Sequence, residues 1–284
     1  MTAKERRKAL KALLGSGKTI AVPGVYDAVS AKLVENAGFP IVYVGSYTSA
    51  ASRLGQPDVG ILSLPEMAAH AQCVVDAVRM PVIADFEDGF SKPPNIWRAV
   101  REFERAGVAA IHIEDHVHGK HTDFERVIRP LDQMLARVKA ALDAREDPDF
   151  MIIARTDAAW LYSDPSEAVE RMNAFLEAGA DMVFPAGMKP DRLAKVRSQI
   201  NGKVMVTNFK GVSVAEEEKA GADIVLYYGF CLYAAYHGVK SALAQFRDGR
   251  DFNKIPEVIG SVDDFEKFIG YDGFAARAKK YGLL

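Results

Sequence analysis

Short apolar runs rich in β-branched residues recur along the whole chain and predict eight β-strands. In chain order the runs are TIAVP from Thr19, IVYV from Ile41, PVIAD from Pro81, AAIHIE from Ala109, MIIAR from Met151, DMVFP from Asp181, KVMVT from Lys203 and DIVLYY from Asp223. The stretches between them, such as EMAAHAQCVVDAV and NIWRAVREFERA, have the apolar spacing and the composition of helices. Strands that alternate with helices in this way predict a parallel sheet.

A small motif that ends in glycine or alanine precedes several of these strands. It reads ENAG at 35–38, ERAG at 104–107, EAGA at 177–180 and KAGA at 219–222. Glycine in this place can adopt the left-handed conformation that ends a helix and returns the chain to the sheet. Eight strand–helix units favour a closed (β/α)₈ barrel over an open doubly wound sheet. The first strand is followed by VPGVYDA rather than G-x-G-x-x-G, which disfavours dinucleotide binding.

Helical segments are expected at both ends of a single barrel domain that spans residues 1–284. Residues 1–17 predict an N-terminal helix, and 230–246 predict the eighth helix of the barrel. Residues 247–284 predict a helical extension whose aromatic side chains, such as Phe265 and Phe268, need a covering surface. We expect this extension to pack on the barrel or across an interface with a second subunit.

Composition and charge narrow the class of protein and of ligand. Hydrophobic residues make up 49% and charged residues 26%, the formal net charge is -2 and the pI is about 6.3. This balance is typical of a soluble enzyme and provides no basic surface for nucleic acid. Two cysteines, Cys73 and Cys231, are too few for a disulfide framework, and neither a signal peptide nor a membrane span is predicted. The expected setting is the cytoplasm, and the expected partner is a small molecule.

Polar residues gather at the predicted carboxyl ends of the strands, where barrel enzymes carry their chemistry. The third, fourth and fifth strands end in Asp85, Glu87 and Asp88, in Glu114, Asp115 and His116, and in Arg155, Thr156 and Asp157. Three acidic clusters at one end of a barrel would repel one another unless a cation lay among them. Oxygen ligands favour Mg²⁺ or Mn²⁺. A single cluster would be equally well explained as helix capping, but three in succession favour metal or substrate binding.

Several of these segments resemble the isocitrate lyase and phosphoenolpyruvate mutase superfamily, over a stretch from about Lys18 to Phe246. The matching motifs are VPGVYDAVSAKLVENAGFPIVYVGSYTSAASRLGQPDVG, IADFEDGF, HIEDH and IARTDA. The resemblance implies that Asp85 holds Mg²⁺ directly or through water. It implies that Asp58, Glu87 and Glu114 complete the metal site through ordered waters.

The same resemblance implies roles for the residues that meet the substrate. Ser46, with the backbone N–H groups of Ser46 and Tyr47, would receive the substrate carboxylate. Arg155 would bind substrate oxygens and stabilise the developing charge, and Asn208 would line the pocket. Taken alone, Ser46 and Asn208 would be interpreted as turn residues. The superfamily also exchanges its last helix between neighbours, so a homo-oligomer, either a dimer or a tetramer, is expected.

One loop departs from the pattern of the isocitrate and methylisocitrate lyases. Their K-[KR]-C-G-H run carries a catalytic cysteine, whereas this chain reads HGKHTD at 118–123, which keeps Lys120 and places Thr122 at the cysteine position. Their acidic residue after the sixth strand is replaced by Ala186. A true isocitrate or methylisocitrate lyase is therefore not expected. His118 or His121 is the candidate for the missing general acid, since histidine titrates near neutral pH.

The function expected from this reasoning is cleavage of a C–C bond in a small 2-oxo or 2-hydroxy di- or tricarboxylate, through a metal-stabilised, pyruvate-type enolate. An oxaloacetate decarboxylase or a lyase of the dimethylmalate or methylisocitrate type without the cysteine would fit. Chemistry at a C–P bond, by a phosphonopyruvate mutase or hydrolase, is the alternative. A Schiff-base aldolase is disfavoured because neither Lys203 nor Lys210 lies inside a predicted strand, and a barrel without catalysis has no need of the acidic residues.

Overall fold

The computed structural model describes residues 1–117, 125–255 and 259–283, which form two compact units, Met1–Leu232 and Tyr233–Leu284. The boundary lies inside one helix, α11 (Phe230–Gly249). The larger unit contains the sheet, and the smaller one is helical. The single domain expected for 1–284 stays a prediction.

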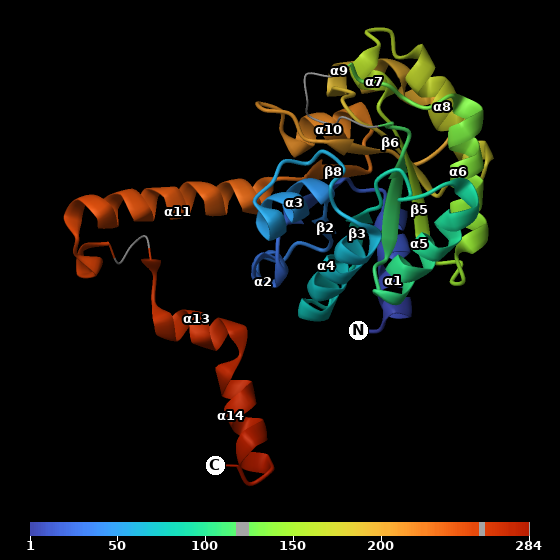
Figure 1. Cartoon of the computed structure of the whole chain (residues 1–284). Coiled ribbons are helices and arrows are strands. Elements are labelled where there is room, and N and C mark those ends of the chain that lie inside the picture. Colours follow the sequence, from blue (N-terminus) through green and yellow to red (C-terminus); the bar gives the residue numbers. More distant parts are fainter. Residues whose placement is uncertain (118–124, 256–258, 284) are drawn as a thin grey trace. The chain divides into compact units, whose positions relative to one another are not determined.

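Eight parallel strands of the described chain form a barrel at the centre of the larger unit (Figure 1). They are β1 (Ile20–Val25), β2 (Val42–Val44), β3 (Val82–Asp85), β4 (Ala110–Glu114), β5 (Met151–Thr156), β6 (Met182–Pro185), β7 (Met205–Thr207) and β8 (Ile224–Tyr227). Their order is β6-β5-β4-β3-β2-β1-β8-β7, and an isolated parallel bridge between Val183 and Val204 joins β6 to the chain just before β7. Six strands fall within their predicted runs, while β1 continues two residues past its run to Val25 and β5 continues one residue past its run to Thr156. The predicted (β/α)₈ barrel is confirmed.

Helices surround the strands and supply the outer layer of the core. After α1 (Ala3–Gly15), they are α2 (Ala28–Asn36), α3 (Ser46–Leu54), α4 (Leu64–Ala77), α5 (Pro93–Arg105), α6 (Leu131–Ala144), α7 (Ala158–Leu161), α8 (Ser166–Glu177), α9 (Pro190–Val196), the 3₁₀ turn η1 (Arg197–Gln199) and α10 (Val214–Ala220). Helices α3 and α7 follow β2 and β5 directly and were not predicted. Gly45 and Gly55 bound α3, and Gly55 ends it in the left-handed conformation.

Helix α1 closes the amino-terminal end of the barrel. Leu10 and Leu14 are buried in one cluster with Ile20, Ile41 and other residues near the starts of the strands. The Arg7 guanidinium donates to the carbonyl oxygens of Glu104 and Val108, just before β4. With this end filled, the carboxyl ends of the strands remain as the open face of the barrel.

The smaller unit consists of most of α11, the 3₁₀ turn η2 (Phe252–Lys254), α13 (Val262–Ile269) and α14 (Tyr271–Lys280). It exposes many large apolar side chains, among them Tyr236 at 65%, Leu243 at 63% and Phe274 at 64%. No helix among the described residues is long and apolar enough to cross a membrane.

Candidate active site

Five of the predicted site residues line one cavity of about 320 Å³ at the carboxyl ends of the strands. They are Tyr47, Asp58, Asp85, Arg155 and Asn208. The register of the parallel sheet explains part of this arrangement, because it places Asp85 beside His112 and Glu114 beside Arg155 on neighbouring strands. Residues separated by many positions in sequence are thus brought to one place by strand pairing.

The carboxylate of Asp85 is fixed by donors from three segments. Its Oδ2 accepts from the Ser46 backbone N–H at 3.2 Å, from Ser46 Oγ at 2.9 Å and from the Tyr43 hydroxyl at 3.3 Å. Its Oδ1 accepts from the backbone N–H of Glu87 at 2.9 Å. In this structure Ser46 therefore orients Asp85, and the predicted contact of Ser46 with a substrate carboxylate stays a prediction.

A group of possible metal ligands surrounds Asp85. Ligand atoms of Asp85, His112 and Glu114 all lie within 4.8 Å of one another, and the three side chains are buried. Asp58 and Glu87 are also buried, at 5% and 9% exposed. So many carboxylates out of contact with bulk water are unfavourable without a cation, and oxygen donors suit a hard divalent ion. The residues present therefore fit the expected metal.

His112 was not predicted and belongs to the same network. Its side chain is fully buried, and Nε2 lies 2.9 Å from the Tyr43 hydroxyl and 3.8 Å from Asp85 Oδ1. Burial and the neighbouring Asp85 carboxylate raise the pKa of Tyr43 well above its ordinary value, so its hydroxyl keeps its proton. The tyrosine can then donate to Asp85.

The turn after β3 has a strained backbone. Glu87 has φ 49° and Phe90 has φ 58°, both in the left-handed region that residues other than glycine seldom adopt. This conformation lets the N–H of Glu87 reach Asp85. Strained residues of this kind often mark functional sites.

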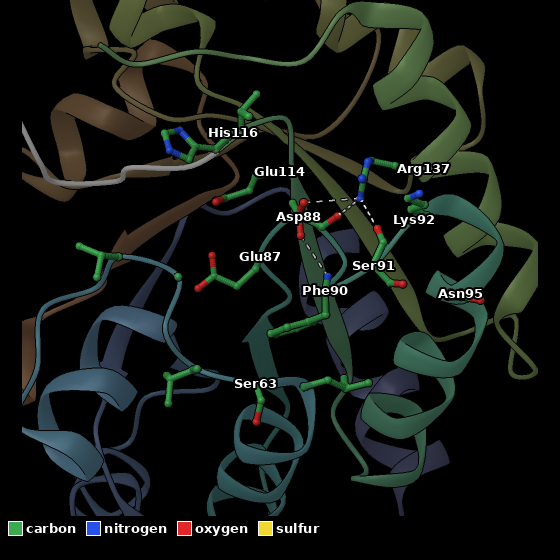
Figure 2. A pocket seen from close by; sticks show the side chains of 15 residues that line it. Ser63, Glu87, Asp88, Phe90, Ser91, Lys92, Asn95, Glu114, His116 and Arg137 are labelled. Atoms are coloured by element: carbon green, nitrogen blue, oxygen red, sulfur yellow. Dashed lines mark hydrogen bonds and ion pairs between the residues drawn. The ribbon is translucent and has the colours of Figure 1, made fainter. Parts of the chain in front are cut away.

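Glu87 and Glu114 line a second, larger cavity of about 900 Å³. Figure 2 shows both side chains and that of His116 around the same hollow. Asp88 instead turns toward Arg137, and it also pairs with Arg129. Asp88 thus holds this loop in place. Of the four predicted metal residues, Asp58 and Asp85 line the small cavity, and Glu87 and Glu114 line the larger one.

Arg155 is clamped between two carboxylates. Nη1 lies 2.8 Å from Glu114 Oε2, while Nε and Nη2 both lie 2.9 Å from Asp157 Oδ1. Burial lowers the pKa of Arg155, but Asp157, Glu114 and Asp85 outweigh burial and raise that pKa well above its ordinary value. The guanidinium is therefore a permanent, positioned positive charge in the cavity.

Asp115 supports this clamp from behind. It is fully buried and accepts from Thr156 Oγ1 at 2.6 Å, from the Asp157 N–H at 2.9 Å and from Arg171 Nη1 at 3.3 Å. Burial raises the pKa of Asp115 to about 6, although these donors lower it. Asp115 therefore stabilises the segment that carries Asp157 and does not belong to the acidic group around Asp85.

The remaining wall of the small cavity is largely aromatic and aliphatic. Tyr47 meets Tyr228 edge to face, with ring centroids 5.4 Å apart. Ala186 also lines this wall, so the alanine predicted to replace an acidic residue does face the cavity. Two residues that were not predicted, Arg126 and Trp160, complete it. The predicted catalytic residues His118, Lys120, His121 and Thr122 lie outside the described residues.

Comparison with known proteins identifies the family. The family model described as phosphoenolpyruvate phosphomutase matches residues 10–247. The 2,3-dimethylmalate lyase of Eubacterium barkeri is 35% identical, with 93% of each chain covered. The 2-methylisocitrate lyase of Shewanella oneidensis is 32% identical, with 92% of each chain covered. The solved structure of a phosphonopyruvate hydrolase in complex with oxalate and Mg²⁺ superimposes with a TM-score of 0.89 at 27% identity, covering 99% of each chain.

These matches extend over nearly the whole chain and confirm the resemblance found in the strand-end motifs. The chain therefore belongs to the phosphoenolpyruvate phosphomutase family, within the superfamily that also contains the isocitrate lyases.

Proposed function

We propose that this chain is a Mg²⁺-dependent carbon–carbon lyase that acts on small 2-oxo or 2-hydroxy di- or tricarboxylates. The observation that carries the proposal is the clamped Arg155 beside the fixed carboxylate of Asp85 in one small cavity. A permanent cation next to a cluster of metal-binding oxygens suits a substrate that carries negative charge on its carboxylate and its 2-oxygen, as the enolate of a cleaved 2-oxo acid or the alkoxide of a 2-hydroxy acid does. Two of the relatives, which cover 93% and 92% of the chain, are lyases that act on acids of this class, as their names state.

Asp85 would hold Mg²⁺, or Mn²⁺ in its place, and Asp58, Glu87 and Glu114 would act through water. Bound metal would supply Lewis-acid stabilisation of negative charge on the substrate oxygens, worth several kcal/mol. The support for this assignment is the burial of all four carboxylates and the donors that fix Asp85. His112 is placed to orient the Tyr43 hydroxyl.

Other residues of the chain would bind the substrate and transfer a proton. Arg155 binds the substrate oxygens and keeps its charge at every step because two carboxylates hold it. The N–H groups of Ser46 and Tyr47 begin helix α3, whose N-terminal end favours a carboxylate, and the Ser46 N–H would be shared between the substrate and Asp85. Asn208 offers an amide from the β7 end. Lys120, with His118, His121 or Thr122, would supply a proton to the carbanion that cleavage leaves. That carbanion is the released fragment of a 2-hydroxy acid, or the retained enolate when a 2-oxo acid loses carbon dioxide.

Chemistry at a C–P bond is the second candidate. The close structural match with a phosphonopyruvate hydrolase favours it, because that enzyme has the same fold and was solved with Mg²⁺. A phosphonopyruvate-type substrate would use the same carboxylate anchor and differ only in the leaving group. The substrate panel below separates the two candidates.

The assembly is proposed to be a homo-oligomer, either a dimer or a tetramer, in which the C-terminal helices are exchanged between subunits, and its location is proposed to be the cytoplasm. The support for the assembly is the number of exposed large apolar side chains on the smaller unit.

The test combines metal removal with a substrate panel. Purified protein stripped with EDTA and resupplied with Mg²⁺ is incubated with oxaloacetate, methylisocitrate, dimethylmalate and phosphonopyruvate, and both pyruvate and phosphoenolpyruvate are measured. At least one carbon substrate should be cleaved only when metal is present. Asp85→Asn should abolish turnover while the fold, followed by circular dichroism, is retained.

Asp88→Asn is the matched control, because Asp88 lies in the same turn but pairs with Arg129 and Arg137. It should keep the metal requirement. Full activity in chelator would contradict the proposed metal dependence. Turnover of phosphonopyruvate alone would move the assignment to the C–P candidate.

A further inference from the structure

Arg126 differs from Arg155 in how its charge is balanced, although both guanidinium groups line the small cavity. Arg155 has carboxylate oxygens at 2.8 and 2.9 Å. Arg126 Nη1 lies 4.0 Å from Asp157 Oδ2, and its side chain is 28% exposed. An ion pair of that length is weak and leaves most of the N–H groups of an arginine able to bind a ligand.

The position of Arg126 is set by Trp160 on α7. The Arg126 Cζ atom lies 4.8 Å from the centre of the Trp160 ring, within the range of a cation–π contact. Stacking on a ring occupies the flat face of the guanidinium and leaves its N–H edge for hydrogen bonds. The arginine is thus presented to the cavity in a defined orientation.

Trp160 is itself held in place by contacts with other parts of the chain. A Cβ atom at Gly187 would lie 2.6 Å from the Trp160 ring, so the ring rests directly on a glycine backbone. Arg192 donates to the carbonyl oxygens of Ala159 at 2.9 Å and Tyr162 at 2.8 Å, which secures the short helix α7 on both sides of the ring. A pre-organised arginine loses little conformational entropy when it binds an anion.

The two arginines flank the same carboxylate. Asp157 faces Arg155 through Oδ1 and Arg126 through Oδ2. Both guanidinium groups therefore lie beside one carboxylate in one small cavity, and a ligand bound to Arg155 by one end would need only a short chain to bring its other end to Arg126. The ligand group that matches a planar arginine edge is a second carboxylate, through paired N–H···O bonds.

We infer that Arg126, stacked on Trp160, is the specificity-determining residue that recognises the distal carboxylate of the substrate. The inference rests on the proposed function, since it takes Arg155 and the acidic residues as the anchor of the first carboxylate. It assigns the second carboxylate of the proposed di- or tricarboxylate substrate to one named residue.

Matched pairs of ligands test the inference by binding alone. Malate is compared with 2-hydroxybutanoate, and 2-oxoglutarate with 2-oxopentanoate, because each pair differs only by a distal carboxylate in place of a methyl group. Affinities are measured by calorimetry with Mg²⁺ present. In the native protein the carboxylate member of at least one pair should bind roughly tenfold more tightly, as a charge-assisted bidentate contact predicts.

Arg126→Gln should remove the preference for the member with a distal carboxylate. Arg126→Lys should keep part of that preference. The fluorescence of Trp160, observed in a Trp97→Phe background, should respond to the preferred dicarboxylate and much less to its methyl partner. The chain has two tryptophans, and Trp97 lies on α5 beside Arg101, away from the residues that line this cavity. The substitution therefore leaves a single reporter that touches Arg126.

Oxalate separates failure of the inference from failure of the proposed function, because its second carboxylate stands where the 2-oxo group of a substrate would be and it has no distal group. If oxalate binds with Mg²⁺ but neither pair shows a preference, the assignment of Arg126 is overturned and the proposed function stands. If oxalate does not bind, the proposed anchor itself fails. A preference that survives Arg126→Gln and disappears in Lys210→Gln would transfer the role to Lys210, the exposed lysine that also lines the cavity, and would overturn the inference.

Discussion

Glu217 is a carboxylic acid buried on the barrel helix α10, where its side chain is 1% exposed. Among the residues that the structure describes, neither of its carboxyl oxygens has a hydrogen-bond partner. Burial raises the pKa of Glu217 from 4.5 to about 7, and the neighbouring Glu216 adds to this effect. The folded protein therefore retains a proton on Glu217 at pH values where the unfolded chain has released it.

This difference predicts that the free energy of unfolding falls as the pH rises from about 4.5 to about 7. Below that window both states are protonated, and above it both are ionised, so the full loss is present above pH 7. Because α10 lies near the surface, the loss is discounted to about 2 kcal/mol. Urea unfolding at pH 5 and pH 8 should show a smaller pH dependence for Glu217→Gln than for the native protein.

The exposed neighbour Glu218 provides the control, and Glu218→Gln should keep the native pH dependence. An unchanged dependence in Glu217→Gln would show that this buried acid is not its source.

Residues at the ends of strands could be predicted as site residues from sequence, whereas residues inside strands could not. The acidic residues and Arg155 follow apolar runs, and a barrel gathers such positions at one face. Tyr43 and His112 lie within apolar runs, where a polar side chain is usually a satisfied core residue. The available signal was strand alternation, because His112 and Glu114 point to the same side of β4. Arg126 and Trp160 lie on connecting segments whose shape no local pattern determines.

At the level of elements, β1 and the end of β8 approach each other unusually closely at Gly24. A Cβ atom at this position would lie 2.0 Å from the carbonyl oxygen of Tyr228. Backbone atoms cannot move aside as the end of a flexible side chain can. Only glycine therefore allows β1 to hold Tyr43 on β2 in its observed register, since Gly24 is paired with Tyr43.

Gly24→Ala should lower the free energy of unfolding by about 2–4 kcal/mol, because the added methyl group overpacks the sheet. Chemical unfolding followed by circular dichroism measures the change. Gly15→Ala is the matched control, since a Cβ at Gly15, at the end of α1, meets nothing within 4 Å. The control should change stability by no more than about 1 kcal/mol. Equal effects of the two substitutions would contradict the close approach.

The strands and the long helices could be predicted because their hydrophobic periodicity is strong, but the short helices α3 and α7 could not. α7 contains only four residues, AAWL, too few for a period to emerge. α3 consists largely of serine, threonine and alanine, so it has no apolar spacing that would distinguish a helix. Both helices lie beside the cavity and carry Tyr47 and Trp160, so the missed elements are those that shape its wall.

On the scale of the whole molecule, the exposed apolar side chains of the smaller unit predict self-association. Tyr236 and Leu243 on α11 are more than half exposed, which is costly for a helix that stays in water. Light scattering should give a dimer or a tetramer rather than a monomer of 31.1 kDa.

The double substitution Tyr236→Ser and Leu243→Ser should shift the assembly to a smaller species. Gln245→Ser, at an exposed polar position of the same helix, should leave the assembly unchanged. A native protein that elutes and scatters as a clean monomer would contradict the proposed oligomer.

The single bridge between Val183 and Val204 makes the barrel mechanically uneven. β4 and β5 are paired without interruption from the pair Ala110–Met151 to the pair Glu114–Arg155. The strands that carry the acidic side of the cavity are therefore continuously hydrogen-bonded. Phe184 and Asn208 reach the cavity from either side of the sparsely bonded seam. Because fewer backbone hydrogen bonds join β6 to β7, we expect the wall above them to yield to a bulkier acid more readily than the charged wall does. Evolution of new substrates within this architecture should therefore alter residues along the seam first.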